Sequence, residues 1–492
     1  MSYTEQQKQS QDSQQKSVFY ITTTLPYVNA DPHIGFALEI IQADIVARYK
    51  TLAGYEVFFN TGTDEHGLKI HQKAAEQGEE TQVYVDRFAH RFMALKDILN
   101  LSYTHFIRTT DAHHKKAAQA FWNLCLEKGD IYKAEYETKY CIGCELEKQD
   151  SELENGLCPI HPTTPIQLIK EENYFFRYSK YQQALLDLYA TVPDFVVPKG
   201  RLNEIKSFVE GGLKDFSISR LKEKMPWGIP VPGDEKHVMY VWFDALVNYI
   251  STTGWPDKKE VFETVWPGVQ VAGKDNLRQQ AAMWQAMLIS AGLPTSKQIF
   301  IHGFITSGGQ KMSKSLGNVI NPLEIVAEYG ADALRYFIAH QLPAYEDGDF
   351  TLERFKEAYN TQLANGIGNL TSRILKMAVS YEISFDGIEE GGNEILLALD
   401  APLSQFNFAE ASDIVWRRIG SVDRYIQEHA PFKKIKVVET ADEAKRDVAY
   451  LLAELYKIAS ALQPIMPETS VKILNLLNNR EFPEVPLFMR KD

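Results

Sequence analysis

Cysteine and long apolar segments are both scarce in this sequence. The chain of 492 residues contains four cysteines, too few for a scaffold held together by disulfides. Three of them, Cys141, Cys144 and Cys158, fall within 18 residues, a clustering that favours metal binding over cross-linking. No run of about 18 apolar residues occurs, so the sequence predicts no membrane span.

Positive charge is also in deficit, because 65 acidic residues outnumber 52 Lys and Arg and leave a formal net charge of −13. This balance argues against a protein that coats nucleic acid without specificity, although it permits a local basic face that reads one folded RNA. Residues 1–17 are polar and glutamine-rich, with neither arginine nor an apolar centre. They lack the features of a secretory signal or a transit peptide, so we expect a disordered tail on a cytoplasmic protein.

The length of the chain predicts roughly two to four domains, and the pattern of its apolar residues predicts an α/β fold. Residues 18–24 have the composition of a buried strand, residues 34–54 show helical spacing, and residues from 56 read as a second strand. Strand, helix and strand in this order predict a parallel sheet with right-handed crossovers. We expect a tail (1–17), an α/β domain in two parts (18–130 and 226–351), an inserted domain (131–225) and an all-helical domain (352–492).

The first candidate site follows the first predicted strand, in the stretch TLPYVNADPHIGFALEII (24–41). A helix that begins directly after a buried strand presents free N–H groups and the positive end of its dipole, which suit a phosphate. His33 and position 36 are three residues apart, so both lie on one side of the first turn. A histidine that only caps the helix or packs locally fits this short string equally well.

A second candidate site lies in TSGGQKMSKSLGN (306–318). Lys311 and Lys314 flank Ser313, with Ser315 behind them and two glycines ahead. Such a glycine-hinged loop can close over a polyphosphate and neutralise the charge that grows as pyrophosphate leaves. The alternative, a solvated basic loop, fits so particular a string less well.

The clustered cysteines form part of a metal-binding pattern. Cys141 and Cys144 are followed by a second pair with the same spacing, Cys158 and His161. Three thiolates and one imidazole at these spacings predict a tetrahedral zinc site. Four protein ligands leave no open position, so we expect a structural metal. An unmetallated hairpin is the weaker alternative, and Cys125 is left over as a buried helix residue.

The two phosphate-type motifs together resemble the paired signatures of class I aminoacyl-tRNA synthetases. Four further stretches resemble the methionyl-tRNA synthetase family, and the resemblance runs from residue 18 to the end of the chain. It implies a Rossmann-like catalytic domain with an inserted zinc-knuckle domain, followed by an anticodon-binding helical bundle. The four stretches are TGTDEHG (61–67), MPWGIP (225–230), YVWFDALVNYI (240–250) and ADALRYF (331–337).

The resemblance also implies an activity and its partners. The chain is expected to convert L-methionine and ATP, with Mg²⁺, to methionyl-adenylate and pyrophosphate. It would then transfer methionine to the 3′ end of initiator and elongator methionine tRNAs. The zinc would be structural. We expect a monomer, because no additional tRNA-binding domain follows the helical region.

Individual residues take roles from the same resemblance. His33, Lys311 and Lys314 are implied to be catalytic, and Asp64 to hold the amino group of methionine, since a carboxylate is the natural partner of an ammonium. Aromatic walls suit the thioether of methionine, although Trp242 and Trp284 alone would be read as core residues. Further implied ATP contacts are Gly35, Ser313 and Ser315, and further implied pocket residues are Leu25, Tyr27, Ala245, Leu246, Tyr249 and Gln280.

Five positions, in three regions of the chain, depart from the family pattern. Phe36 replaces a second histidine, and the absence of one charged phosphate contact costs about 1.5–3 kcal/mol, or about 10- to 150-fold. The pair Gln279-Gln280 replaces Phe-His, which predicts a pocket of altered polarity. In the predicted anticodon region, Asp423 stands where Asn is usual and Phe432 where Trp is usual. Candidate donors that offset Phe36 are His66, Lys311 and Lys314.

Three other functions are alternatives to this one. A synthetase for leucine, isoleucine or valine is disfavoured, because residues 131–225 leave no room for an editing domain. A catalytically silent relative that binds tRNA is supported only by Phe36. A small nucleotidylyltransferase would have no use for the helical region after residue 352.

Overall fold

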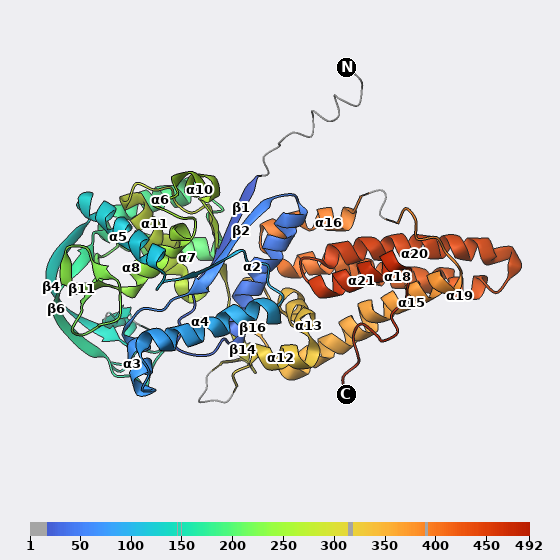
Figure 1. The fold of residues 1–492 in the computed structure, drawn as a ribbon, viewed down its shortest axis with the longest axis horizontal. Helices are drawn as coiled ribbons and strands as arrows, with labels where there is room; N and C mark the ends of the chain where they lie inside the picture. The colour runs from blue at the N-terminus through green and yellow to red at the C-terminus, as the bar shows by residue number, and fades with distance from the viewer. Residues whose placement is uncertain (1–16, 145, 149, 313–317, 389–391) are drawn as a thin grey trace, which may run out of the picture.

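A six-stranded sheet lies at the centre of the larger lobe of the molecule (Figure 1). The computed structural model describes residues 17–144, 146–148, 150–312, 318–388 and 392–492. The strand order is β3-β2-β1-β12-β13-β7 and every neighbouring pair is parallel, which confirms the predicted parallel sheet. The strands are β1 (Val18–Thr23), β2 (Glu56–Thr63), β3 (His105–Arg108), β7 (Val196–Val197), β12 (Val269–Gly273) and β13 (Gln298–His302).

Helices cover both faces of this sheet. Phe19 and Ile21 of β1 pack into one hydrophobic core, whereas Tyr20 between them packs into a second core on the opposite face. An apolar strand buried on both faces is typical of a parallel sheet. The first face carries α2 (Ile34–Leu52), α3 (Leu68–Glu76) and α4 (Thr81–Ile98), and the second carries α5 (Ala112–Glu127), α8 (Val241–Leu246), α9 (Asn248–Ser251), α10 (Lys259–Val265) and α11 (Trp284–Ser290).

The segment between the two parts of the sheet has a different architecture. A four-stranded antiparallel sheet of order β5-β4-β6-β8 lies at the outer edge of the larger lobe (Figure 1). Strand β7 also falls within residues 131–225, yet it pairs with β13 in the central sheet. The elements here are β4 (Ile131–Cys141), β5 (Leu146–Lys148), η1 (Asp150–Glu152), β6 (Gln167–Phe176), η2 (Tyr178–Tyr181), α6 (Gln182–Thr191), α7 (Lys199–Glu210), β8 (Phe216–Ser217), β9 (Ser219–Leu221), β10 (Pro230–Val231) and β11 (Asp234–Met239).

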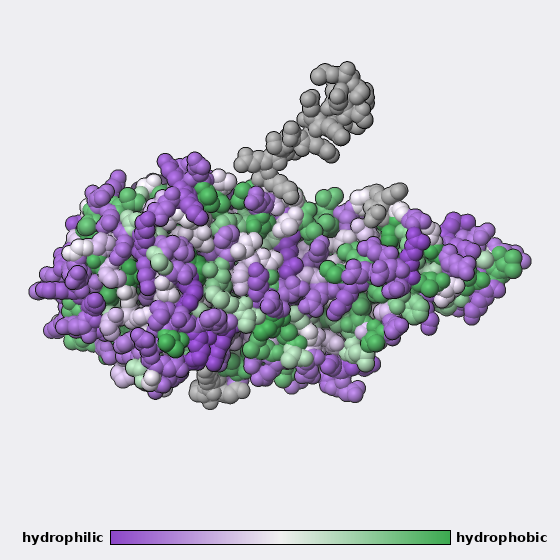
Figure 2. All heavy atoms as spheres, viewed as in Figure 1, coloured by the Kyte–Doolittle hydropathy of each residue, from purple (hydrophilic) through white to green (hydrophobic). Residues whose placement is uncertain are grey.

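Helices dominate the rest of the chain and form an elongated lobe (Figure 1). Polar residues cover most of the face seen in Figure 2, and none of the described helices is both long and apolar enough to cross a membrane. The elements after β13 are β14 (Ile305–Ser307), β15 (Gln310–Lys311), α12 (Pro322–Tyr329), α13 (Ala331–Tyr336), η6 (Phe337–Gln341), β16 (Gly348–Asp349), α14 (Leu352–Ala358), η7 (Tyr359–Gly368), α15 (Asn369–Ser380), α16 (Glu394–Ala398), α17 (Asp400–Ser404), α18 (Phe408–His429), α19 (Pro431–Lys434), η8 (Val438–Thr440), α20 (Ala441–Leu462) and α21 (Pro467–Asn479).

A buried ion pair connects the two lobes. The guanidinium of Arg335 lies 2.7 Å from the carboxylate of Asp44 on α2, and both side chains are fully buried. Arg335 also donates to the carbonyls of Pro464 and Ile465, just before α21. Burial alone would raise the pKa of Asp44, but Arg335 and Arg48 outweigh it and hold that pKa below its ordinary value. Helix α2 is therefore fixed from both lobes.

Candidate active site

Four loops meet at the carboxyl ends of the central strands. They follow β1, β2, β12 and β13, and the strand order reverses between β1 and β12. In open parallel sheets, ligands bind outside the carboxyl ends of the strands at such a reversal. A cavity of about 490 Å³ lies here, lined by residues from three of these loops, among them Thr24, Gly273 and Gly303.

The start of α2 is shaped by His33. This residue is the N-cap of the helix, and its Nδ1 accepts a hydrogen bond of 3.1 Å from the backbone N–H of Gly35. A Cβ atom at residue 35 would lie 2.9 Å from the imidazole Cε1, so this ring position requires glycine. His33 also lines the cavity. The capping interpretation and the ligand-binding interpretation of the sequence are therefore compatible, because the two ring nitrogens can serve different partners.

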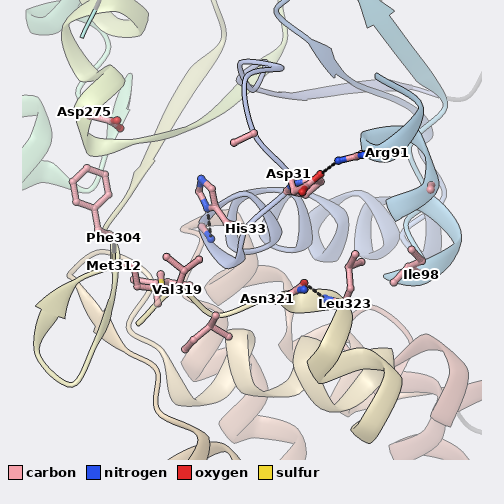
Figure 3. A pocket seen from close by; sticks show the side chains of 16 residues that line it. Asp31, His33, Arg91, Ile98, Asp275, Phe304, Met312, Val319, Asn321 and Leu323 are labelled. Carbon is pink, nitrogen blue, oxygen red and sulfur yellow. Dashed lines mark hydrogen bonds and ion pairs between the residues drawn. The ribbon is translucent and has the colours of Figure 1, made fainter. Parts of the chain in front are cut away.

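A second, larger cavity of about 850 Å³ opens at the same helix start (Figure 3). His33 and Gly35 line it from α2, Arg91 lines it from α4, and Met312 lines it from the segment after β15. Figure 3 shows Arg91 reaching toward Asp31 on the loop before α2, with which it forms an ion pair. The two phosphate-type motifs of the sequence thus border one space.

Phe36 does not line this larger cavity, although it lines the adjoining 490 Å³ cavity. Its ring meets that of Phe92 on α4 edge-on, with centroids 5.2 Å apart, and it is packed against the first hydrophobic core. The altered position in the motif has therefore become a packing contact between α2 and α4. His66, one of the predicted substitutes, is buried elsewhere, with its Nδ1 3.1 Å from a carboxylate oxygen of Asp244 on α8.

The glycine hinge of the second motif is a tight hairpin between β14 and β15. Gly308 and Gly309 have φ angles of +61° and +72°, a region that favours glycine. The carboxylate of Asp349 accepts hydrogen bonds of 2.8 Å from the N–H of Gly309 and the hydroxyl of Thr306. Lys311 ends β15, paired with Thr306. Ser313, Lys314 and Ser315 lie outside the described residues.

A small cavity of about 50 Å³ gathers most of the residues predicted to bind an amino acid. Asp64 is only 3% exposed, and its backbone pairs with that of Tyr27 in an isolated bridge that holds the first two loops together. Asn248 and Asn276 also line this cavity and were not predicted. Asn248 lies inside the YVWFDALVNYI stretch, so the motif itself contained the signal. The predicted residues that line the cavity are Leu25, Tyr27, Asp64, Trp242, Ala245, Leu246, Tyr249 and Gln280.

Trp284 occupies a layer behind this cavity. It is fully buried, with its ring centroid 6.0 Å from that of Tyr249 and 5.5 Å from that of Phe121. Gln280 lies in a π-helical turn, η4 (Gln279–Met283), and accepts a hydrogen bond of 3.1 Å from the side chain of Gln270. Such turns are frequent at functional sites.

Three of the recognised stretches interlock beside the small cavity. The indole N–H of Trp227 donates to the carbonyl of Glu65, and the N–H of Gly67 donates to the carbonyl of Trp227. Glu65 accepts two hydrogen bonds, of 2.7 and 2.9 Å, from Arg108 on β3. The close approach of His66 to Asp244, with 3.1 Å between Nδ1 and a carboxylate oxygen, completes the frame. Asp64 is thereby held on a loop that is fixed on both sides.

His302, at the end of β13, lies against α2 through Glu39. Glu39 accepts hydrogen bonds of 2.7 and 2.6 Å from the N–H and hydroxyl of Thr24, and its other oxygen lies 3.1 Å from Nε2 of His302. Burial lowers the pKa of His302, but the hydrogen bond and charge of Glu39 outweigh this effect and raise the pKa above its ordinary value. This pair ties α2 to the end of β13.

The four predicted metal ligands form one cluster. The ligand atoms of Cys141, Cys144, Cys158 and His161 all lie within 4.8 Å of one another, and the Sγ atoms of Cys144 and Cys158 are 3.5 Å apart. This spacing and donor set fit a tetrahedral zinc ion with Zn–S distances of about 2.3 Å. A Cβ at residue 143 would lie 2.4 Å from the imidazole of His161, so the turn requires Gly143. Gly143, Cys144 and His161 also line the 490 Å³ cavity.

The residues predicted to read an anticodon lie far from this site, in the helical lobe. Asp423 on α18 forms an ion pair with Arg373 on α15 and accepts a 2.7 Å hydrogen bond from Gln427. Phe432 on α19 is 39% exposed. Figure 1 places α19 toward the outer end of that lobe.

Comparisons with known proteins find relatives along most of the chain. The family model described as tRNA synthetases class I (M) matches residues 19–163 and 142–375. The chain is 42% identical over 481 residues to the methionine–tRNA ligase of Thermosynechococcus vestitus, covering 93% of this chain and 90% of the relative. It is 40% identical over 488 residues to the methionine–tRNA ligase of Brucella suis, covering 95% and 94%.

Solved structures are similar over the same extent. The structure of Mycobacterium tuberculosis methionyl-tRNA synthetase in complex with methionyl-adenylate has a TM-score of 0.89 and 36% identity, and the match covers 96% of this chain and 100% of that one. The apo form of the same enzyme has a TM-score of 0.83 and 32% identity, with 97% and 99% covered.

Proposed function

Because the chain belongs to the methionyl-tRNA synthetases of class I, we propose that the loops at the carboxyl ends of β1, β2 and β12 bind its substrates. The protein is an aminoacyl-tRNA ligase that activates L-methionine with ATP and charges methionine tRNA. The observation that best supports the placement is the convergence of Asp64, Trp242 and Tyr249 on one small cavity beside His33. The sibling-synthetase and nucleotidylyltransferase alternatives are set aside by the family assignment.

Methionine would lie in the small cavity, with its ammonium at Asp64. The buried carboxylate offers a charged hydrogen-bond acceptor that little solvent screens. The thioether would lie among the rings of Tyr27, Trp242 and Tyr249, which suit a polarisable sulfur. Trp284 would support Tyr249 from behind, and the side-chain amide of Gln280 would set the polarity of one wall.

ATP would enter as its Mg²⁺ complex and place its phosphates at the start of α2. The methionine carboxylate attacks the α-phosphorus, the bond to the β-phosphate oxygen breaks, and pyrophosphate leaves with its charge. His33 and the free N–H groups near Gly35 would bind phosphate oxygens. Lys311 and Lys314 would neutralise the charge of the leaving pyrophosphate, and Ser313 and Ser315 would donate hydrogen bonds to it. The protein contributes positioning and charge stabilisation rather than covalent chemistry.

In the second step, a hydroxyl of the terminal tRNA ribose attacks the methionyl carbonyl and AMP leaves. The anticodon would meet the outer end of the helical lobe, where the exposed ring of Phe432 can stack on a base. Asp423, held by Arg373 and Gln427, would accept a hydrogen bond from a base amino group.

A structural zinc ion would be held by the Cys141, Cys144, Cys158 and His161 cluster. With four protein ligands it would take no part in the reaction, and it would fix the turn that contributes Gly143 to the cavity wall. Charging of a methionine tRNA transcript with labelled methionine tests the whole assignment. We expect charging that requires ATP and is abolished when the anticodon is changed. Adenylate formation without charging would refute the tRNA assignment alone.

A further inference from the structure

Phe36 fixes the position of α4 beside the start of α2. Its ring packs edge-on against Phe92 of α4, with centroids 5.2 Å apart. This packing places α4 alongside the first turn of α2. Arg91, the neighbour of Phe92 in the chain, therefore borders the same 850 Å³ cavity as His33 and Gly35.

Arg91 brings a positive charge to a cavity that Asp31 and Asp275 also line. Among the described residues that line the 850 Å³ cavity, Arg91 is the sole lysine or arginine. The described residues that line the adjoining 490 Å³ cavity include no lysine or arginine. Its guanidinium carbon lies 4.8 Å from the ring centre of Phe88, and it forms an ion pair with Asp31, two residues before His33 (Figure 3). The side chain is 44% exposed, so it is oriented yet open to a ligand.

We propose that Arg91 binds the triphosphate of ATP and supplies the charged interaction that Phe36 cannot make. The inference rests on the proposed function of the α2 start. An arginine presents a planar fork of donors that matches phosphate oxygens in a bidentate geometry. The ion pair with Asp31 is exposed and therefore weak, so a polyphosphate of higher charge displaces the carboxylate and takes over the guanidinium.

A simpler role for Arg91 predicts different behaviour. Asp31 stands at the mouth of a phosphate site, where a free carboxylate repels ATP, and Arg91 could serve only to neutralise it. In that case removing both charges would restore ATP binding. If Arg91 contacts phosphate, Asp31→Asn alone should leave ATP binding unchanged or improved. The double variant Asp31→Asn with Arg91→Ala should then remain defective.

ATP–pyrophosphate exchange at saturating methionine measures the effect, with ATP varied. We expect Arg91→Ala to lower kcat/KM for ATP about 10- to 150-fold and to leave KM for methionine unchanged. Arg87→Ala is the matched control, because Arg87 lies one turn earlier on α4, pairs with Glu79 and does not line the cavity. It should stay within about twofold of wild type.

A double-mutant cycle with Phe36→His tests whether the two positions share one ligand. A histidine at position 36 restores a phosphate-binding group, so the defect caused by Arg91→Ala should be smaller in that background. Equal defects in both backgrounds would overturn the inference. An Arg91→Ala protein that behaves like Arg87→Ala would also overturn it. So would a double variant, Asp31→Asn with Arg91→Ala, that behaves like wild type. Absence of exchange in the wild type would instead refute the proposed function.

Discussion

Replacing Asp64 by Asn should weaken methionine recognition without disturbing the ATP site. The change keeps the shape of the side chain but removes its charge, so the substrate ammonium no longer has an ionic partner. Asp64 is 3% exposed, and solvent screens its interaction with the ammonium only weakly. A charged hydrogen bond contributes about 1.5–3 kcal/mol, and burial favours the upper end. We therefore expect kcat/KM for methionine to fall about 100-fold.

ATP–pyrophosphate exchange with methionine varied provides the assay for this variant. KM for ATP should be unchanged, because Asp64 lines the small cavity and not the larger one. A methionine analogue without its amino group should inhibit wild type and variant equally. Asp257→Asn, which removes an exposed carboxylate paired with Lys116, serves as a control. A change below about threefold in kcat/KM for methionine would refute the assigned role of Asp64.

Three further predictions concern the groups that frame the site. Cys158→Ser should reduce bound zinc from about one ion per chain; elemental analysis showing unchanged zinc would contradict the cluster. His302→Gln should lower the free energy of unfolding most at about pH 5 and least at about pH 9. The reason is the raised pKa of His302 beside Glu39, which stabilises the fold below the unfolded pKa; this stabilisation is lost as pH rises through the folded pKa. A pH-independent difference in urea unfolding would refute this prediction. Arg335→Met should cost about 3–5 kcal/mol, because buried Asp44 loses one of its two guanidinium partners and the carbonyls of Pro464 and Ile465 lose their donor; a destabilisation below about 1 kcal/mol would contradict this.

Local sequence patterns were sufficient for the parts of the fold that depend on periodicity. The β-branched and aromatic composition of residues 18–24 predicts a buried strand, and the structure buries the side chains of Phe19, Tyr20 and Ile21 in cores on both sides of it. The paired cysteine spacing predicts the metal cluster because its ligands lie on two short turns, so little depends on distant packing. Both outcomes follow from interactions between residues close in the chain.

Contacts between distant segments could not be predicted in the same way. The sequence indicates that Phe36 is unusual, but not that Phe92 packs against it, because that contact depends on how α4 crosses α2. His66 looked like a free donor next to Asp64 and is instead paired with Asp244, far along the chain. Strand β7 is two residues long, too short to carry a periodic signal, and it joins the sheet through its partner β13.

The amino-acid dependence of ATP–pyrophosphate exchange, measured without tRNA, tests the central claim most directly. Exchange reports adenylate formation alone, so it depends on the methionine cavity and the α2 start and not on the helical lobe. We predict exchange with methionine and none with leucine, isoleucine or valine. The contradicting result is folded, zinc-loaded protein that binds tRNA but shows no exchange with any amino acid. That result would mean that the ATP site at Phe36 does not work and that the protein binds tRNA without catalytic activity.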